Sequence, residues 1–246
     1  MDMKTISLQG KVALITGAGR GIGRAIALAL AQEDVAVAVL ARTEKEVQET
    51  VQEVEKQNGK ALPFIADITH PEQIQQCVET ILQKWGQIDI LINNAGFAKF
   101  KPFEELSLEE WKQTIDVNLT GTFIVTKSVL PNMIQRKSGT IINISSVSGL
   151  RPIPKQSAYC ASKHGVIGLT TTLAMEMKPY NIRVHAICPG GVITRLSQEN
   201  MSERDMSDWM MPEDVAHTVM YLLTQHPRAT TDIIYLRRYG SVPLGG

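Results

Sequence analysis

Short apolar runs alternate with longer amphipathic stretches along this chain of 246 residues. Nearly continuous apolar runs are typical of strands that are covered on both faces, whereas apolar residues recurring every three or four positions indicate helices. In the first half the runs predict strands at 11–16, 35–40, 61–66 and 88–92, and the amphipathic stretches predict helices at 21–33, 43–57 and 71–85. This alternation is typical of a parallel sheet with crossover helices.

The second half continues the alternation. It predicts helices around 108–135, 157–177 and 212–223, and strands at 140–145, 183–188 and near 232–236, with a polar, methionine-bearing segment reaching Met211. No internal repeat or linker divides the chain. We therefore expect an α/β fold with one domain over residues 1–246, in which helices cover both faces of a doubly wound, mostly parallel sheet of about seven strands. Its ligand should bind at the carboxyl ends of the strands.

Composition narrows the class of partner. The chain has 25 Lys and Arg against 25 Asp and Glu, and these charges are scattered, so we expect a small-molecule partner and neither nucleic acid nor membrane. Cys77, Cys160 and Cys188 are widely separated, which favours neither a metal site nor a disulfide framework. With no signal peptide recognisable at the amino terminus and no apolar stretch long enough to span a membrane, the expected location is cytoplasmic.

A glycine-rich loop directly follows the first predicted strand and opens the first helix. Its glycines are Gly17, Gly21 and Gly23. Glycines at this place let the backbone approach a pyrophosphate, while the N–H groups and dipole of the helix attract its charge. The alternative is a turn that merely packs the helix on the strand. The strand–loop–helix context favours a dinucleotide-binding Rossmann fold.

The end of the second strand indicates which dinucleotide binds. Folds that bind NAD place an Asp or Glu there for the ribose hydroxyl, but this chain has Ala41 followed by Arg42. A guanidinium suits a 2′-phosphate, and Arg20 adds a second positive charge nearby. The pattern predicts NADP(H), although Arg42 as a solvated surface arginine is the alternative.

A candidate acid–base pair lies in the helix that begins near Ser157. Tyr159 and Lys163 are four residues apart and therefore share one face, where the ammonium should lower the pKa of the phenol. Ser146 ends the preceding strand and can donate to a substrate oxygen. Ser145 and Ser148 are competing candidates by position, and either could instead cap the turn after the strand.

Together these motifs resemble the short-chain dehydrogenase/reductase family over nearly the whole chain. The resemblance rests on Thr16-Gly17-x-x-x-Gly21-x-Gly23, Asn93-Asn94-Ala95-Gly96, Tyr159-x-x-x-Lys163 and Pro189-Gly190. It implies the catalytic set Asn118, Ser146, Tyr159 and Lys163, with Asn118 supporting a water beside Lys163. The implied cofactor contacts are Gly17, Arg20, Gly21, Ile22, Gly23, Arg42, Asp67, Ile68, Asn94, Ala95, Gly96, Tyr159, Lys163, Pro189, Gly190, Val192 and Thr194.

Within that set, the resemblance gives some residues a specific contact. Asp67 and Ile68 meet the adenine, Asn94 the adenosine ribose and Thr194 the nicotinamide carboxamide, while the backbone of Ile22 meets the pyrophosphate. Lys163 also binds the nicotinamide ribose. For Asn93 to Gly96 a purely structural turn is the alternative, and for Asn118 a satisfied core asparagine.

The expected function is therefore NADP(H)-dependent hydride transfer between the nicotinamide and a carbonyl or secondary alcohol, with Tyr159 as general acid and base. A 3-oxoacyl-(acyl-carrier-protein) reductase is one alternative. The ending DIIYLRRYGSVPLGG departs from the Val-Asp-Gly-Gly ending of many such reductases and is more similar to members acting on small hydroxy compounds such as hydroxy acids. A catalytically silent NADP-binding sensor is the other alternative, although the complete tetrad argues against it.

The family resemblance also implies a quaternary structure and a lid. Members are usually homodimers or homotetramers, with helices such as those at 108–135 and 157–177 packing across a twofold axis. A substrate lid is expected at about 191–211. Its large apolar side chains could line the substrate pocket or pack a short helix: Met201, Met206, Trp209, Met210 and Met211.

Overall fold

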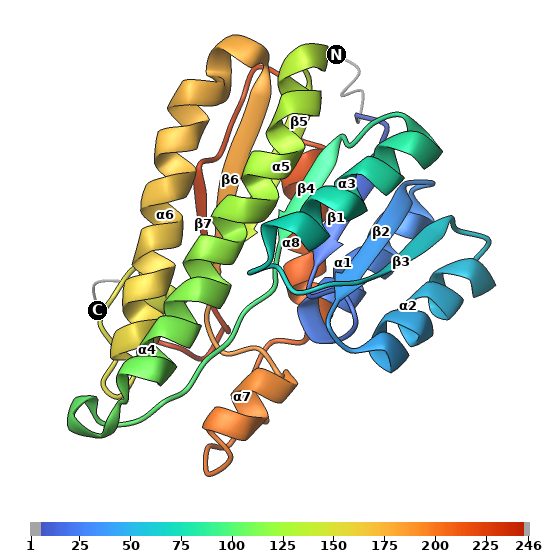
Figure 1. Ribbon diagram of the computed structural model, residues 1–246. Coiled ribbons are helices and arrows are strands. Elements are labelled where there is room, and N and C mark those ends of the chain that lie inside the picture. Colours follow the sequence, from blue (N-terminus) through green and yellow to red (C-terminus); the bar gives the residue numbers. More distant parts are fainter. Residues whose placement is uncertain (1–5, 244–246) are drawn as a thin grey trace.

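The computed structural model describes residues 6–243, and its centre is one sheet of seven parallel strands in the order β3-β2-β1-β4-β5-β6-β7 (Figure 1). The strands are β1 (Val12–Thr16), β2 (Ala36–Ala41), β3 (Ala61–Ile65), β4 (Ile90–Asn93), β5 (Gly139–Ile144), β6 (Ile182–Pro189) and β7 (Ile233–Leu236). The strand order reverses between β1 and β4, which is where an open α/β sheet forms its ligand crevice.

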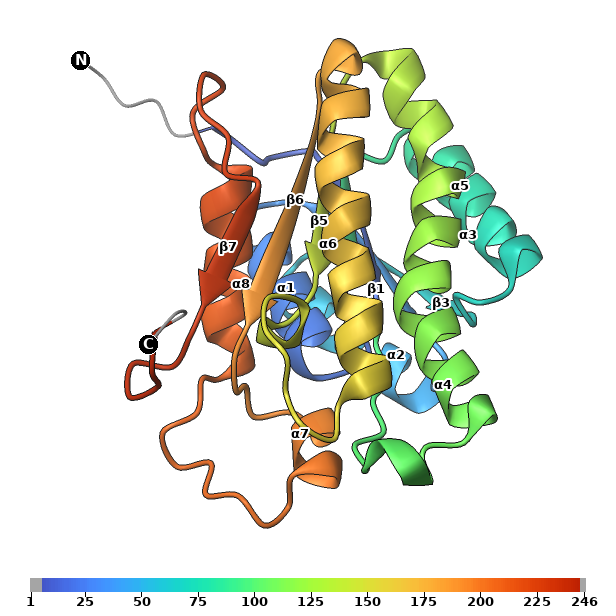
Figure 2. The same cartoon turned by 90° about the vertical axis from the view of Figure 1, so that its left-hand side faces the viewer.

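Helices cover both faces of the sheet, as the two views show (Figures 1 and 2). One face carries α1 (Gly21–Gln32), α2 (Glu44–Lys56) and α8 (Pro212–Leu223). The other carries α3 (Pro71–Trp85), α4 (Leu108–Ile115), α5 (Gly121–Arg136) and α6 (Ser157–Met177). The short helix α7 (Arg195–Asn200) projects beyond the carboxyl ends of the strands.

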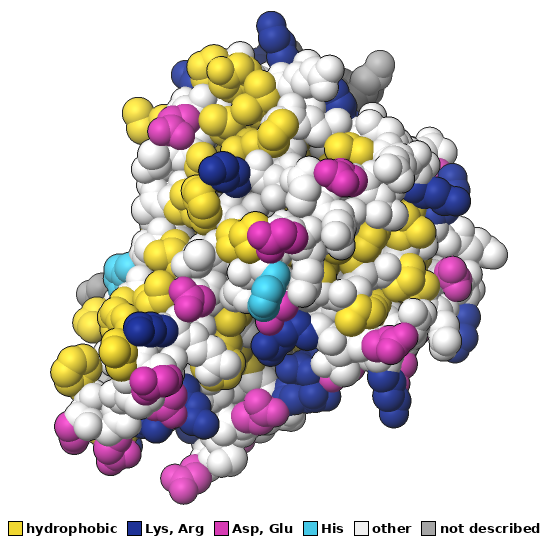
Figure 3. All heavy atoms as spheres, in the orientation of Figure 1, with side chains coloured by type: hydrophobic (Ala, Val, Ile, Leu, Met, Phe, Trp, Pro, Cys, Tyr) yellow, Lys and Arg dark blue, Asp and Glu magenta, His cyan; other side chains and the backbone are white. Residues whose placement is uncertain are grey.

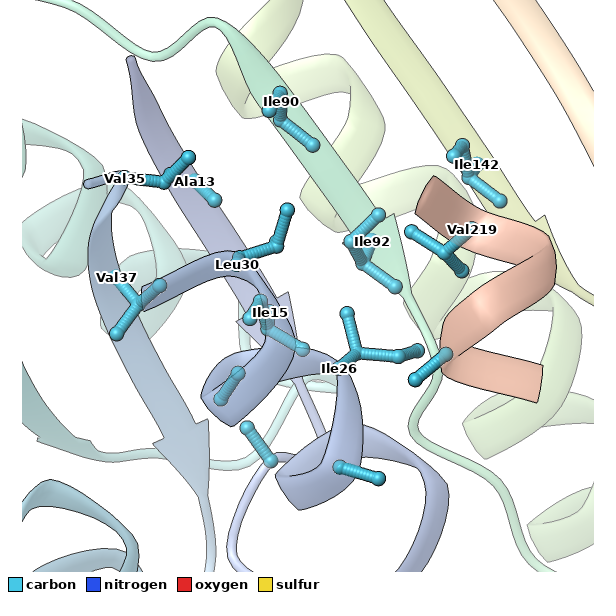
Figure 4. Close-up of a cluster of buried hydrophobic side chains, with 14 of the residues drawn as sticks. Ala13, Ile15, Ile26, Leu30, Val35, Val37, Ile90, Ile92, Ile142 and Val219 are labelled. Atoms are coloured by element: carbon cyan, nitrogen blue, oxygen red, sulfur yellow. The ribbon is translucent and has the colours of Figure 1, made fainter. Parts of the chain in front are cut away.

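The hydrophobic core lies between the sheet and each helical layer. On the α1 side, Ile26 of α1 and Val219 of α8 point toward Ile15 and Ile92 of the central strands, and all four are fully buried (Figure 4). Both faces of these strands are covered, which explains why their sequences are continuously apolar. Pro63 is tolerated because β3 is an edge strand that needs no hydrogen bond on its outer side.

The predicted fold class is confirmed, and the predicted elements end within two residues of the observed ones, with two differences. The helix predicted at 108–135 is divided into α4 and α5 by a π-helical turn at Asp116–Thr120. The polar segment before Met211 contains α7. Residues 1–5, which begin the amino-terminal segment in which no signal peptide is recognised, and residues 244–246 lie outside the described residues.

Polar side chains join the sheet to the α5–α6 layer. Asn93 donates to Thr126 of α5 at 2.9 Å and to Asn143 of β5 at 2.8 Å, and Asn143 donates to Thr170 of α6 at 2.8 Å. All four side chains are buried, so each of these hydrogen bonds matters for packing. They hold the carboxyl halves of β4 and β5 in register with the helices that cover them.

A buried carboxylate joins elements at the amino ends of the central strands. Asp89, only 4% exposed, accepts from the backbone N–H of Val12 at 2.9 Å and pairs with Arg136 at the end of α5. We expect Asp89→Ala to lower the free energy of unfolding by about 3 kcal/mol, because it leaves a guanidinium and a buried N–H without their partner. Urea unfolding measures the change.

The matched control is Glu79→Ala, which removes an exposed carboxylate of α3 whose hydrogen-bond partner is Gln75, one turn earlier. That variant should change the free energy of unfolding by less than about 0.5 kcal/mol. Equal effects of the two substitutions would contradict the structural role of Asp89.

Candidate active site

A cleft with a volume of about 390 Å³ runs along the carboxyl ends of the strands, between the glycine loop, the start of α6 and the segment around α7. This volume lies within the range of roughly 300–1,000 Å³ that ligand pockets occupy. Segments from both halves of the chain line it, because the crossovers after β1 and β4 leave toward opposite faces of the sheet. The lining includes both the predicted phosphate loop and the predicted acid–base pair.

The glycine loop has the backbone that its sequence predicts. Gly17 and Gly21 have φ angles of +63° and +54°, which only glycine adopts without strain. A Cβ at Gly23 would lie 2.4 Å from the carbonyl oxygen of Gly17, so this glycine keeps α1 close to the loop. The first turn of α1 has neither a capping side chain nor an acidic residue. Its N–H groups therefore fit the diphosphate of a dinucleotide.

Asn94 and Thr16 join the two strands that flank the crevice. The Asn94 side-chain amide donates to the carbonyl oxygens of Thr16 and Gly17 at 3.0 and 3.1 Å. In return, the Thr16 hydroxyl accepts from the backbone N–H groups of Asn94 and Ala95 at 3.0 and 3.1 Å. Asn94 and the residues after it therefore have the structural role that the sequence left open, while Asn94, Ala95 and Gly96 also line the cleft.

Arginines and carboxylates alternate at the end of the cleft near β2 and β3. Glu46 of α2 accepts a hydrogen bond from Arg20 at 2.8 Å and forms an ion pair with Arg195 of α7 at 2.9 Å. In Figure 3 a group of Lys and Arg side chains lies beside the end of α7 nearest the rest of the protein. The Glu46 contacts join α7 to α2, and the side chains of Arg20, Glu46 and Arg195 all line the cleft. The sequence analysis missed both Glu46 and Arg195.

Arg42 and Asp67 face each other at the same end, with 3.7 Å between guanidinium and carboxylate. Burial by itself raises the pKa of Asp67, but hydrogen bonds from Thr69 and the charge of Arg42 lower it below its usual range. Asp67 is therefore ionised at neutral pH. Arg42 remains largely exposed, with 62% of its side chain accessible, so it can also reach a further anion.

Tyr159 and Lys163 lie together on the wall of the cleft, as their spacing predicts. The ammonium of Lys163 is 5.6 Å from the centre of the Tyr159 ring and donates to the carbonyl oxygen of Ile144 at 2.9 Å. The ring of Phe100 meets the Tyr159 ring edge-on, with 5.5 Å between centres. Lys163 is buried, and Tyr159 is half-buried on the cleft wall.

Burial, and not the charge of Lys163, dominates the pKa of Tyr159. Burial raises the pKa of Tyr159 to about 12, and the neighbouring Ser146 hydroxyl offsets this only in part. Burial likewise lowers the pKa of Lys163 to about 8, which still leaves it mostly protonated at neutral pH. The prediction of a lowered phenol pKa is therefore wrong, because desolvation of the phenol outweighs the influences that lower its pKa. Tyr159 is protonated at neutral pH.

The structure separates the three candidate serines. Ser145 donates to the backbone carbonyl oxygen of Lys163 at 3.0 Å, and Ser148 donates to Gln156 at 2.8 Å. The protons of both hydroxyls are therefore used in hydrogen bonds within the protein. The Ser146 hydroxyl donates to that of Ser148 at 3.3 Å and accepts its N–H at 3.1 Å, and it also neighbours Tyr159, whose pKa it lowers. Of the three, Ser146 has the hydroxyl most available to a ligand beside Tyr159.

Two of the predicted site residues do not line the cleft, Gly23 and Asn118. The buried side chain of Asn118 donates to the Phe97 carbonyl and Ser162, and it accepts from the Phe97 N–H at 2.7 Å. Its side chain is therefore the satisfied core asparagine that the sequence kept as an alternative. Asn118 lies in the π-helical turn, a feature that often marks functional sites.

The other predicted residues line the cleft, including Ile22, Ile68, Pro189, Gly190, Val192 and Thr194. Thr194 also caps α7, because its hydroxyl accepts from the N–H of Ser197 at 3.2 Å. Of the five large apolar residues proposed for the lid, only Met201 and Trp209 line the cleft. Met210 is instead buried and pairs its backbone with that of Val192.

The sequence analysis missed several arginines of the cleft, namely Arg151, Arg204, Arg237 and Arg238. For Arg237 and Arg238 a signal existed, because both directly follow the last predicted strand, whose carboxyl end faces the ligand crevice. Arg151 and Arg204 lie on connecting segments, where the hydrophobic pattern does not predict which way a side chain points.

Comparisons with known proteins agree with this geometry. The profile of a protein family described as "short chain dehydrogenase" matches residues 11–205. A 3-oxoacyl-(acyl-carrier-protein) reductase of Thermotoga maritima is 38% identical over 91% of this chain and 94% of its own length. None of the helices in the described part of the chain is long and apolar enough to cross a membrane.

Two solved structures superpose closely on the chain. A metagenomic short-chain oxidoreductase in complex with NADP gives a TM-score of 0.83 at 33% identity, covering 94% of this chain and 99% of its own. An NAD⁺-bound xylitol dehydrogenase gives a TM-score of 0.85 at 29% identity, covering 94% and 98%. Similar proteins thus bind either nicotinamide dinucleotide.

Burial of Lys163 should make the stability of the protein depend on pH. The decrease of its pKa from 10.5 to about 8 corresponds to about 3 kcal/mol against the charged form. Replacement by Met removes this cost but also removes the hydrogen bond to Ile144, so we expect Lys163→Met to be more stable by about 2 kcal/mol at pH 7.

The sign of the pH dependence follows from the protons bound. Between pH 8 and 10.5 the unfolded chain holds the Lys163 proton and the folded chain does not, so the stability of the wild type rises with pH relative to the variant. Thermal unfolding at a series of pH values measures the difference, which should shrink across this window. A constant difference would contradict the lowered pKa.

Proposed function

Because the chain belongs to the short-chain dehydrogenase/reductase family, we propose that it is an NADP(H)-dependent oxidoreductase that interconverts a carbonyl compound and the corresponding alcohol. The observation that carries the proposal is the meeting of Tyr159, Lys163 and Ser146 in one cleft with a glycine loop suited to a diphosphate. When bound, the cofactor supplies or accepts the hydride.

Tyr159 is proposed as the proton donor in reduction. The phenol is protonated at neutral pH, as donation of a proton to the carbonyl oxygen of the substrate requires. Ser146 donates a hydrogen bond to the same oxygen and stabilises its developing negative charge. In the oxidation direction Tyr159 must first lose its proton, so alcohol oxidation should become faster as the pH rises.

Lys163 and Asn118 complete the proposed tetrad in different ways. Lys163 lies close enough to stabilise the Tyr159 phenolate and to bind the ribose next to the nicotinamide. Asn118 is proposed as a positioning residue, because its side chain fixes the backbone of Phe97 in the segment after Gly96. In this way it shapes the floor of the cleft beside Gly96.

The preference for NADP(H) is proposed from the charges near β2. The exposed guanidinium of Arg42 follows β2 directly, at the place where an acidic residue would bind the ribose of NAD. The remaining cofactor contacts are proposed as the family resemblance implies them, from Gly17, Ile22, Asp67, Asn94 and Thr194. All five line the cleft.

The second candidate function is reduction of 3-oxoacyl groups on acyl carrier protein. It is favoured by the 38% identity with the reductase of Thermotoga maritima. The two functions differ in whether the substrate is a thioester held on a carrier protein or a free small molecule. Turnover of 3-oxobutanoyl thioesters of acyl carrier protein, compared with free small ketones, distinguishes them.

We further propose that residues 191–211 act as a substrate lid and that the protein is a cytoplasmic homodimer or homotetramer. The lid is supported by the cleft-lining side chains of Met201 and Trp209. The oligomer is supported by large exposed apolar side chains on α5 and α6, including Phe123 and Met175. Figure 3 shows hydrophobic side chains gathered over the region of these two helices.

Replacing Tyr159 with Phe tests the proposed chemistry. We expect kcat for carbonyl reduction to fall by about 100-fold or more, as for loss of a general acid, while the Kd for NADPH changes less than about threefold. Steady-state assays with a panel of ketones and aldehydes measure the first, and NADPH fluorescence measures the second. Turnover near the wild-type level would overturn the assignment, and tight NADPH binding by a wild type that turns over no carbonyl would favour the sensor.

Replacing Arg42 with Ala tests the cofactor preference. Loss of a charge-assisted contact with the 2′-phosphate should raise the KM for NADPH by about 10- to 100-fold and leave the KM for NADH unchanged. The matched control is Lys45→Ala, which removes an exposed charge of α2 that lies outside the cleft lining. If the wild type uses NADH better than NADPH, the NADP(H) proposal fails.

A further inference from the structure

The charged side chains that line the cleft differ between its two ends. At the end formed by the segments after β1, β2 and β3, arginines share the lining with the carboxylates of Glu46 and Asp67. At the end formed by the segments after β5, β6 and β7, the described lining holds no carboxylate. Its charged side chains outside α6 are Arg151, Arg195, Arg204, Arg237 and Arg238.

Three of these five arginines are bound by the chain itself. Arg195 pairs with Glu46 at 2.9 Å across the cleft. Arg237 donates to three backbone carbonyls of the turn that follows β7, the nearest being that of Ser241 at 2.6 Å. Arg238 pairs with Asp208 and lies over the ring of Trp209, 5.9 Å from its centre. These contacts hold the segment 191–211 against α2 and the carboxyl-terminal turn.

Arg151 and Arg204 differ from the other three. Within residues 6–243, neither side chain takes part in an ion pair or a hydrogen bond. Their backbones are nevertheless held in turns, since the N–H of Arg151 donates to Val147 at 3.1 Å and that of Arg204 donates to Met201 at 3.0 Å. Arg151 lies five residues after Ser146, and Arg204 lies between α7 and α8.

Two guanidinium groups without a counter-ion in one cleft attract an anion. A guanidinium binds a carboxylate through two parallel N–H···O hydrogen bonds, and such pairs are stronger in a partly enclosed site than in open water. The side chains of Ile153, Met201 and Trp209 line the same cleft and offer apolar surface to a carbon skeleton. The lining thus suits a ligand that combines a short apolar part with one negative group.

We propose that the substrate is a carboxylate-bearing carbonyl compound, an oxo acid with its hydroxy acid as the product, and that Arg151 and Arg204 bind the carboxylate. The inference rests on the proposed function and adds the substrate class. In the reduction, the carbonyl carbon gains a hydride from the reduced nicotinamide and the carbonyl oxygen gains the Tyr159 proton. The carboxylate is unchanged, and the proton returns to Tyr159 from solvent.

The experiment compares acids with neutral analogues of nearly the same shape. The full-length protein is assayed with NADPH and 2-oxobutanoate, 3-oxobutanoate or 4-oxopentanoate, each beside its methyl ester. We expect at least one acid to have a kcat/KM about 10-fold or more above that of its ester, since hydrogen bonds to a charged group contribute this much or more. Added salt should reduce the advantage of the acid.

Arginine variants assign the effect to residues. Arg151→Gln and Arg204→Gln should each raise the KM for the preferred acid by about 10- to 100-fold, while the KM values for its methyl ester and for NADPH stay within about twofold. The matched control is Arg228→Gln, which neutralises an exposed arginine outside the cleft lining. That variant should behave as the wild type.

The outcomes separate this inference from the proposed function. If neutral ketones and esters are reduced as well as the acids, or if the variants weaken acid and ester equally, the substrate class is wrong and the oxidoreductase stands. If no carbonyl is reduced although NADPH binds, the proposed function fails. The anion site is then judged by calorimetry of the same acids on the NADP⁺ complex: binding that Arg151→Gln weakens supports it, and absence of binding overturns it.

Discussion

The hydrogen bonds between the ends of β1 and β4 are the interaction on which the rest of the site depends. There the Thr16 hydroxyl accepts two backbone N–H groups of the segment after β4, and the Asn94 amide donates to two carbonyls of the segment after β1. Neighbouring strands whose crossovers leave toward opposite faces would otherwise diverge at this point. Because four hydrogen bonds hold the two loops together, the glycine loop and the floor of the cleft form one rigid surface.

Lys163 illustrates how the fold trades stability for a reactive environment. Its ammonium is buried against the Ile144 carbonyl, and the same burial lowers its own pKa and raises that of Tyr159. This burial destabilises the charged form of each group, since each loses its solvation by water. Such an arrangement is typical of sites where ligands, once bound, supply the missing interactions.

The two ends of the cleft use arginine differently. Near β2 and β3, Arg20 and Arg42 each pair with a carboxylate and still line the cleft. At the other end, Arg195, Arg237 and Arg238 are held by carboxylates or carbonyls and position segments of the chain. Arg151 and Arg204 have no such partner within residues 6–243, although their backbones are fixed. The residue type alone does not distinguish these arginines from one another. At the end formed by the segments after β5, β6 and β7, Arg151 and Arg204 differ from the other three arginines because no acceptor within residues 6–243 meets their guanidinium groups.

The sequence by itself determined the order of strands and helices, the glycine loop and the shared face of Tyr159 and Lys163. These features follow from local spacing, because helical and strand periodicity decide which side chains are buried and which neighbours share a face. The π-helical turn around Asn118 and the short helix α7 escaped it, since neither changes the apolar pattern enough to be read.

Only the tertiary structure decided which serine hydroxyl remains available, which arginines find a carboxylate, and that burial raises the pKa of Tyr159. Each of these depends on atoms brought together from distant parts of the chain, as when Glu46 meets Arg195. Hydrogen bonding and desolvation are set by that three-dimensional neighbourhood, and periodicity along the sequence records burial without recording the partner.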